Sequence, residues 1–281
     1  EYLLITEKAD LHRLIENLRN AGIFSLDLES TSIEPMRAEI VGLSFSFRPH
    51  HAFYIPVGHT YPGAPQQLAK NEVLENLRPL LEDPSLKKYG QNIKYDYILL
   101  AKSGILLQGL AGDTMIASYL LNPSKHKHSL EELAREYLDR QVITYAEVAG
   151  NGAKAVTFDR VEVQKACRYS AEDADLTLIL ADLLMPKIEA EGFAELFHQV
   201  ELPLVEVLAV MEMNGVKINR PLLASLSEEF AGQLEIISRE IYDLAGENFN
   251  INSPQQLGKI LFEKLKLPGG KRTKTGYSTD V

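Results

Sequence analysis

Three β-rich runs joined by turn-like segments stand near the start of the chain, and helical patterns dominate from residue 72 onward. The runs cover residues 23–29, 39–47 and 52–57, a spacing typical of an antiparallel meander. A short strand is predicted at 2–6, a helix at 7–20 and a loop at 59–67. A later strand, 86–90, leads into a helix at 92–102. Strands followed by helices, with one such βα unit, predict an α/β fold with a mixed sheet flanked by helices.

The rest of the chain is predicted to be mostly helical. Helices are expected at 113–121, 129–139 and 161–184, and the character of the sequence changes near residue 192. Longer helical stretches follow at 194–213, 221–245 and 253–265, and residues 268–276 have the composition of a loop. We therefore expect two domains, 1–192 and 193–281, the second truncated. Because the chain begins with Glu1, we expect a piece of a longer protein.

The net charge of −10 does not by itself select a partner. Residues 259–281 carry six basic and two acidic residues, +4, so the other 258 residues carry −14. An acidic body with a basic end fits a protein that meets phosphate through bound metal, but a solvated acidic surface explains the charge equally well. No apolar run is long enough for a membrane span. The single cysteine, Cys167, excludes an internal disulfide, suits a reducing compartment and fits a small buried helix residue.

The first acidic fragment is a strand in which apolar and polar residues alternate strictly. In Phe24–Glu29, this alternation places Asp27 and Glu29 on one face, about 7 Å apart along the chain. Two such carboxylates can bracket a hard cation, which prefers oxygen ligands. Taken alone, Asp-x-Glu is a common tripeptide, and the solvated face of a half-exposed strand explains it better.

The second acidic fragment opens the helix at 92–102. Asn92 is a candidate N-cap, and Asp96 follows one turn later. An acid near a helix N-terminus is favoured by the macrodipole, and this explains Asp96 as well as a metal site does. The functional interpretation is that Asp96 faces the sheet and holds a cation through water.

The third fragment lies on the long helix at 161–184. Tyr169 and Asp173 are four residues apart and share one face. Ala166, Ser170 and Thr177 extend that face with small side chains, which suggests a pocket wall rather than packed core. A hydrogen-bonded pair on an exposed face is an equally good interpretation. Glu172 and Asp175 point elsewhere on the helical wheel, so we expect them to be solvated.

Other chemistries lack support in the sequence. We find neither a glycine-rich phosphate loop nor a serine nucleophile elbow. His126 and His128 lie in a basic stretch without cysteine partners, so contact with phosphate or solvent is a better interpretation than a zinc site.

Taken together, these motifs resemble the proofreading segment of the bacterial family A DNA polymerases over essentially the whole chain. Asp-x-Glu, Asn-x-x-x-Tyr-Asp and Tyr-x-x-x-Asp occur in the order of the DEDD exonucleases with a tyrosine in the third motif. More specific matches are Val41-Gly-Leu-Ser-Phe45, Gly90-Gln-Asn-Ile-Lys-Tyr-Asp96, Asp113-Thr-Met115, Tyr169-Ser-Ala-Glu-Asp-Ala-Asp175, Met213-Asn-Gly-Val-Lys-Ile218 and Phe249-Asn-Ile-Asn-Ser-Pro-Gln-Gln-Leu257. The resemblance implies a ribonuclease-H-like exonuclease fold for residues 1–192, followed by an incomplete, mostly helical thumb.

The resemblance also implies a role for each acid. Asp27, Glu29 and Asp173 are expected to ligate a tightly held cation. Asp27 is expected to bridge to a second cation, which Asp96 supports through water, while Tyr169 orients the attacking water. The cofactors would be two divalent cations, Mg²⁺ or Mn²⁺, with Zn²⁺ as an alternative at one position.

The resemblance further implies how DNA is held. Gln91 and Asn92 are expected near the 3′-terminal nucleotide. Ile33 and Tyr145 fall at two hydrophobic contacts to the frayed end, where the family more often has leucine and phenylalanine. Lys127 falls where an arginine usually contacts phosphate.

The function implied is a metal-dependent 3′–5′ exonuclease that removes nucleotides from frayed or mispaired 3′ ends of DNA. Its partners would be that single-stranded or frayed end and the remainder of the polymerase chain, in a monomer that contacts no membrane. A bacterial cytoplasmic location with the nucleoid follows from the same resemblance. The piece lacks palm and fingers and is not expected to polymerise. The alternative is a catalytically silent scaffold or DNA-binding module of the polymerase.

Overall fold

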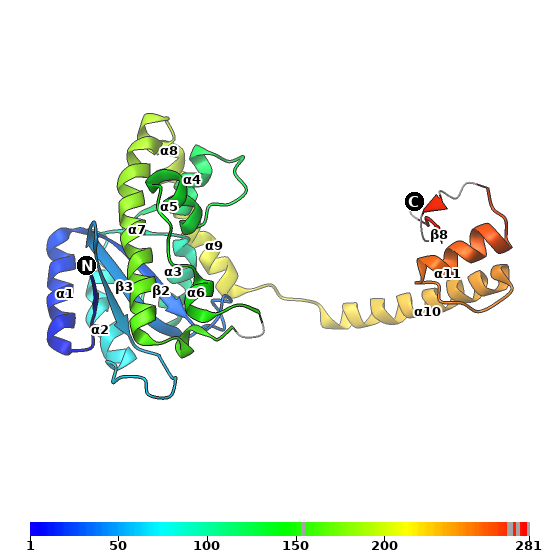
Figure 1. Ribbon diagram of the computed structural model, residues 1–281, viewed down its shortest axis with the longest axis horizontal. Helices are drawn as coiled ribbons and strands as arrows, with labels where there is room; N and C mark the ends of the chain where they lie inside the picture. The colour runs from blue at the N-terminus through cyan, green and yellow to red at the C-terminus, as the bar shows by residue number, and fades with distance from the viewer. Residues whose placement is uncertain (153–154, 269–271, 274–275, 280–281) are drawn as a thin grey trace. The chain divides into compact units, whose positions relative to one another are not determined.

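The computed structural model describes residues 1–152, 155–268, 272–273 and 276–279 (Figure 1). By its internal contacts the chain divides into two compact units, Glu1–Gly215 and Val216–Val281. The domain boundary expected after residue 192 stays a prediction. None of the helices in the described ranges is both long and apolar enough to cross a membrane.

The first unit is built on a mixed sheet, which has six strands within the described residues. In spatial order they are β1 (Tyr2–Leu4), β4 (His51–Pro56), β3 (Ile40–Arg48), β2 (Ile23–Ser30), β5 (Lys87–Gly90) and β6 (Leu110–Asp113). Strands β2, β3 and β4 form the expected antiparallel meander, while β1, β5 and β6 pair in parallel with their neighbours. The mixed sheet is confirmed. Strand β6 was missed because its four residues contain a glycine and no β-branched side chain.

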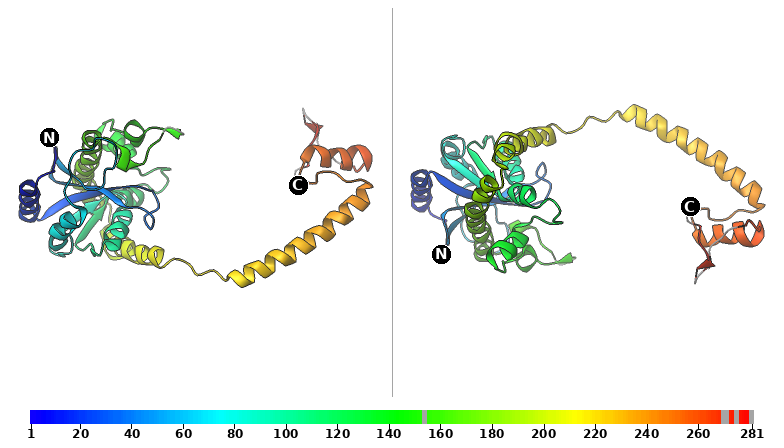
Figure 2. Two further views of the ribbon diagram at one scale, coloured as in Figure 1. Left: turned by 90° about the horizontal axis from the view of Figure 1, so that it is seen from below. Right: turned by 90° about the horizontal axis from the view of Figure 1, so that it is seen from above.

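Helices cover both faces of this sheet. One face packs against α1 (Lys8–Ala21), α2 (Lys70–Leu81) and α3 (Ile93–Lys102), and α9 (Leu202–Asn214) adds to the same core. The long helix α7 (Val163–Ala190) crosses the other face, together with α4 (Thr114–Leu121), α5 (Leu130–Leu138) and the short α6 (Tyr145–Ala149). Figure 2 shows α2 and α3 in cyan and α7 in green on opposite sides of the blue strands. The turn η2 (Phe158–Arg160) precedes α7. After α7 come α8 (Ala194–Leu196) and the π-helical turn η3 (Phe197–Glu201).

The second unit is described by itself. It contains α10 (Arg220–Ala245), α11 (Pro254–Gly258), the π-helical turn η4 (Lys259–Lys264) and a small ladder of β7 (Arg272–Thr273) and β8 (Gly276–Tyr277). Helix α10 buries only Ala245 among its residues. The ladder falls in the segment expected as a loop, of which residues 269–271 and 274–275 lie outside the described residues.

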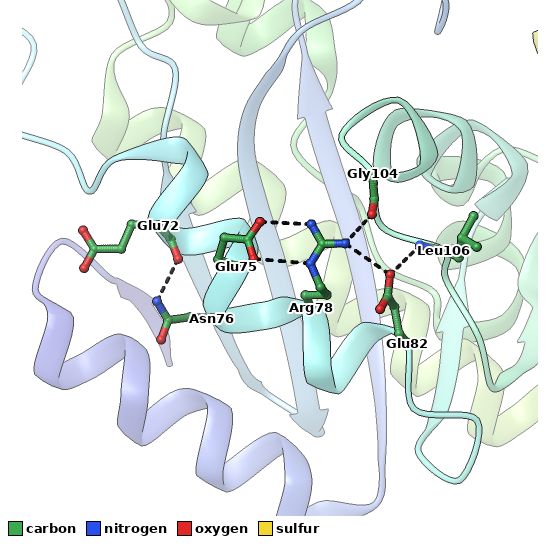
Figure 3. Close-up of polar contacts among 7 residues, drawn as sticks. All are labelled: Glu72, Glu75, Asn76, Arg78, Glu82, Gly104 and Leu106. Carbon is green, nitrogen blue, oxygen red and sulfur yellow. Dashed lines mark hydrogen bonds and ion pairs between the residues drawn. The ribbon is translucent and has the colours of Figure 1, made fainter.

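Helix α2 is tied to the loop between α3 and β6 by one arginine (Figure 3). The Arg78 guanidinium donates to the carbonyl of Gly104 and to the Glu75 carboxylate at 3.0 Å. Glu82 accepts from the Leu106 backbone N–H at 3.0 Å and faces the same guanidinium. These contacts hold the layer of helices that supports α3, the helix on which Asp96 lies.

Helix α7 lies close to the sheet because small residues meet across the contact. Ser170 on α7 donates to the Ser44 hydroxyl at 3.0 Å, and the Ser25 hydroxyl donates to the Ala174 carbonyl at 2.6 Å. Ala166, Ser170 and Thr177 are all buried. The expectation that these small residues line a pocket wall is therefore wrong. They form a closely packed helix–sheet contact, because β3 also presents small side chains there.

Gly42 on β3 leaves room for the side chain of Tyr54 on the neighbouring strand β4. A Cβ atom at Gly42 would lie 2.1 Å from the hydroxyl oxygen of Tyr54, whose ring is fully buried. We expect Gly42→Ala to lower the free energy of unfolding by about 2 kcal/mol, the usual cost of overpacking a core. Urea unfolding followed by circular dichroism measures this. The matched control is Gly232→Ala in α10, where a Cβ meets open space and helix propensity favours alanine. A Gly42→Ala protein as stable as the wild type would contradict this account.

Candidate metal centre

The first two acids of the site lie on β2 and face α7. The apolar residues of β2, Phe24, Leu26 and Leu28, are buried in the core on the side of α1 to α3. Asp27 pairs with Ser44 and Glu29 with Gly42 in the β2–β3 ladder, and a register shift follows at Ser30. The strict alternation therefore does what the sequence predicts, since it turns both carboxylates to one face.

Asp173 on α7 completes a group of three carboxylates. One oxygen each of Asp27, Glu29 and Asp173 lies within 4.8 Å of the others. Glu29 is buried, and the other two are half-buried. The sheet and the long helix thus bring together residues that are far apart in sequence, in a group that could hold a metal ion.

Asp96 is buried beside this group but does not belong to it. It lies in the first turn of α3, and its Oδ1 accepts the backbone N–H of Leu28 at 3.0 Å. Leu28 stands between Asp27 and Glu29, so this bond fixes Asp96 against the strand that carries them. Asp96, the fourth predicted acid, therefore lies near the other three carboxylates but is not a member of their group.

The carboxylates disfavour one another's charge. Burial raises the pKa of Asp27 to about 7, and the nearby Ser170 hydroxyl counteracts part of this rise. Burial, and then the charge of Asp27, raise the pKa of Glu29, Asp96 and Asp173 well above the ordinary range. A cluster of this kind is stabilised by a bound cation, which favours the charged form of each acid.

Tyr169 lies one helical turn before Asp173 and is in hydrogen-bonding contact with its carboxylate. Burial first, and then the negative charges of Asp173 and Glu29, raise the pKa of the Tyr169 phenol far above its usual value. The phenol is therefore neutral and donates its proton to Asp173. The ring packs on two others, with centroid distances of 6.3 Å to Tyr145 and 5.9 Å to Phe158.

A pocket of about 300 Å³ opens beside Glu29. Ile33, Asn92 and Tyr145, three of the residues expected to contact DNA, line it. Ile33 is 94% exposed and Tyr145 44% exposed, so both present apolar surface to the pocket mouth. Asn92 stands at the N-cap position of α3 in a left-handed conformation and does not cap with its side chain. The expected capping role is wrong, because Asp113 accepts the Ile93 N–H at 2.7 Å instead.

Gln91 and Lys127 do not line this pocket. The Gln91 amide donates to the carbonyl of His128 at 2.8 Å and accepts from Thr114. Lys127 is exposed at a separate pocket of about 460 Å³, which Tyr119 and Glu201 also line. Their expected roles toward the 3′ end stay predictions.

Two tyrosines near the site, Tyr95 and Tyr54, were given no role in the sequence analysis. Tyr95 lines the pocket, and its hydroxyl donates to the Ser32 carbonyl. The motif that ends at Asp96 contains Tyr95, but no role was predicted for it. Tyr54 lies near Glu29 and Asp27 and bonds His59 Nε2 at 2.8 Å. Because His59 Nδ1 faces the Val161 carbonyl, Nδ1 carries the proton and Tyr54 donates to Nε2.

Glu172 and Asp175, expected to be solvated, are both buried. Glu172 pairs with Arg140 at 2.7 Å, and Asp175 accepts from the Tyr2 hydroxyl at 2.8 Å. That expectation is wrong, because the segment between α5 and α6 covers one flank of α7 and strand β1 covers another.

Sequence comparison assigns the chain to a known group of enzymes. The profile of a 3′–5′ exonuclease family matches residues 2–189, and the profile of DNA polymerase family A matches residues 220–281. The chain belongs to the family A DNA polymerases. It comprises the 3′–5′ exonuclease domain and the start of the polymerase domain of that family. The expected exonuclease fold followed by a helical segment is confirmed.

Relatives in this family are of substantial identity. The DNA polymerase I of Pseudomonas aeruginosa is 41% identical over 98% of this chain, and that of Rhizobium leguminosarum is 40% identical over all of it. The chain spans 31% and 29% of their respective lengths.

Two solved structures extend the comparison. The POL domain of Pol1 from M. smegmatis, in complex with DNA primer-template and dNTP, has a TM-score of 0.76 and 26% identity. It covers 99% of this chain, which in turn covers 43% of it. Brucella melitensis NrnC with bound Mg²⁺ has a TM-score of 0.52 and 23% identity, over 70% of this chain and 89% of its own, and shares the fold.

Proposed function

We propose that this exonuclease domain is active, and that it removes nucleotides one at a time from frayed or mispaired 3′ ends of DNA as the proofreading part of a polymerase. The observation that carries the proposal is the group of Asp27, Glu29 and Asp173, whose carboxylate oxygens lie within 4.8 Å of one another. The family membership supports the reaction class, since the matching profile is that of a 3′–5′ exonuclease.

The donor set fits a hard divalent cation. All of its ligand atoms are carboxylate oxygens, which Mg²⁺ and Mn²⁺ prefer, with Zn²⁺ as an alternative at one position. Burial raises the pKa of all three acids, and the charge of Asp27 adds to this at Glu29 and Asp173, so a bound cation would favour their charged forms. Asp27, Glu29 and Asp173 would hold the first cation. Asp27 and Asp96 would support a second.

When bound, two cations activate a water molecule and neutralise charge on the scissile phosphate. The chain's own residues prepare that chemistry. The Leu28 N–H holds Asp96 in place beside Asp27. Tyr169, neutral and fixed by its bond to Asp173, presents a hydroxyl oxygen that can orient the attacking water. Because the DNA backbone is an anion, bound cations would also favour substrate binding at this acidic site.

The pocket accounts for the preference for unpaired ends. A terminal nucleotide has to leave the duplex to reach Glu29, and bases then pack on the apolar surface of Ile33 and Tyr145. Mispaired ends fray more easily than paired ones. Selectivity for errors therefore needs no reading of the base.

Metal dependence tests the proposal. We expect the protein to release mononucleotides from a 3′-labelled single-stranded oligonucleotide in Mg²⁺ or Mn²⁺ and to release none in EDTA. A duplex with a fully paired end should be degraded more slowly than one with a mispaired end. Denaturing gel electrophoresis measures the products. If no release occurs with either metal, while the oligonucleotide still binds in an anisotropy assay, the silent scaffold is the correct function.

A further inference from the structure

Glu172 connects the candidate metal centre to a distant loop. The residue is 6% exposed, and each of its carboxylate oxygens accepts one hydrogen bond. Oε1 accepts from Arg140 Nη2 at 2.7 Å, and Oε2 accepts the backbone N–H of Ile143 at 2.8 Å. Both donors belong to residues 139–144, the segment between α5 and α6. A single buried side chain of α7 therefore fastens this segment at two points.

The fastened segment leads directly to a residue of the substrate pocket. Ile143 stands two residues before Tyr145, the first residue of α6. Between them, Thr144 closes the start of α6 with a capping box to Glu147. The Tyr145 ring stacks on Phe158 at 6.2 Å and meets Tyr169 edge to face. Because α6 has only five residues, these contacts and the Glu172 bonds together determine where Tyr145 lies.

We propose that Glu172 is a positioning residue that holds Tyr145 at the substrate pocket. The next residue along α7 is Asp173, a member of the carboxylate group. Adjacent positions of one helix thus fix both the metal centre and the aromatic ring that packs on the terminal nucleotide. The spacing between them is set by the rigid backbone of α7 and not by the loop itself. This inference rests on the proposed function of Tyr145 as a contact to the unpaired 3′ end.

Glu172 could also act by its charge, because it is adjacent to Asp173. Arg140 separates the two mechanisms. It fastens the same segment from the loop side, and its replacement leaves the Glu172 charge in place. If position matters, Glu172→Ala and Arg140→Ala have the same effect. If charge on Asp173 matters, the two changes have opposite effects on metal-dependent activity, because the first removes a negative charge and the second removes its positive partner.

A fluorescence experiment tests the fastening without relying on catalysis. The chain contains no tryptophan, so Tyr145→Trp introduces a single reporter at the pocket. In this background we expect Glu172→Ala and Arg140→Ala each to raise acrylamide quenching of the indole by about twofold, because local opening exposes the ring. The matched control is Arg135→Ala, an ion-paired arginine on α5. It should leave quenching unchanged. Unchanged quenching in Glu172→Ala would overturn the proposal.

Steady-state kinetics on a single-stranded oligonucleotide add a functional measurement. We expect Glu172→Ala and Arg140→Ala to raise KM by about tenfold with kcat close to that of the wild type, the range expected for one lost base–aromatic contact. Adding Tyr145→Ala to Glu172→Ala should raise KM no further than Tyr145→Ala does alone, because both changes remove the same contact. Effects that multiply would show that Glu172 does not act through Tyr145. A wild type that releases no nucleotide would refute the proposed function, while the quenching result would still decide whether Glu172 holds the segment.

Discussion

Asp27→Ala is expected to reduce metal-dependent nucleotide release by at least about 1,000-fold, more than the 10- to 100-fold loss typical of residues that only support a metal ligand. Asp27 is the acid whose charge raises the pKa of Glu29, Asp96 and Asp173 alike, so it lies closest to the centre of the cluster. Without it, neither proposed cation keeps its full set of ligands. Rates at saturating Mg²⁺ on a labelled single-stranded oligonucleotide measure the loss.

The same variant should fold normally. In EDTA, we expect its free energy of unfolding to equal or exceed that of the wild type, because the substitution removes a buried acid that repels its neighbours. The difference should grow as the pH rises from about 4 to about 7. In that window the folded wild type keeps the Asp27 proton, with a pKa of about 7, and the unfolded chain has released it, so rising pH destabilises the wild type by a contribution that the variant lacks.

Two outcomes would contradict these expectations for Asp27. Release at a rate near that of the wild type would exclude Asp27 as a ligand. An unfolded variant would leave the rate uninformative, so the isosteric Asp27→Asn is measured beside it. Asp10→Ala, in the first turn of α1 on the far side of the sheet, is the matched control and should retain full activity.

Local periodicity predicted the parts of the site that depend on one element. The alternation of Phe24–Glu29 was enough to place Asp27 and Glu29 on one face, since a strand has a period of two. The four-residue spacing of Tyr169 and Asp173 was enough to align them on a helix. Neither pattern contains the distance between the strand and the helix. The convergence of the three carboxylates was therefore reached through family resemblance and not through spacing.

Tertiary contacts determined what periodicity could not. The helical wheel placed Glu172 and Asp175 away from the sheet, yet α7 is enclosed on its flanks by residues 139–144 and by the ends of β1 and β4. Asn92 has the sequence position of a cap, but the cap comes from Asp113 on β6, a strand that local patterns did not reveal. In each case a residue distant in sequence supplies the partner.

Tyr169→Phe is expected to lower kcat by about 10- to 100-fold, the range for loss of a group that orients a metal ligand or its water. The substitution removes the hydroxyl that donates to Asp173 and leaves every carboxylate in place. Metal affinity should therefore change little, and KM for the oligonucleotide should stay near the wild-type value because the ring still packs on Tyr145 and Phe158. Titration of activity with Mg²⁺ separates a change in kcat from a change in metal affinity.

The matched control is Tyr137→Phe, which removes a hydroxyl from a ring on α5 that faces Lys187 at 4.6 Å and leaves the site untouched. It should have wild-type kinetics. If Tyr169→Phe instead loses more activity than Asp27→Ala, the phenol and not the carboxylate group would be the main catalytic element, and the assignment of roles would have to be reversed. We expect a loss that is smaller than that of Asp27→Ala and is confined to kcat. The neutral phenol contacts one metal-ligating acid, Asp173, and acts on that acid and on the water, but it holds neither cation itself.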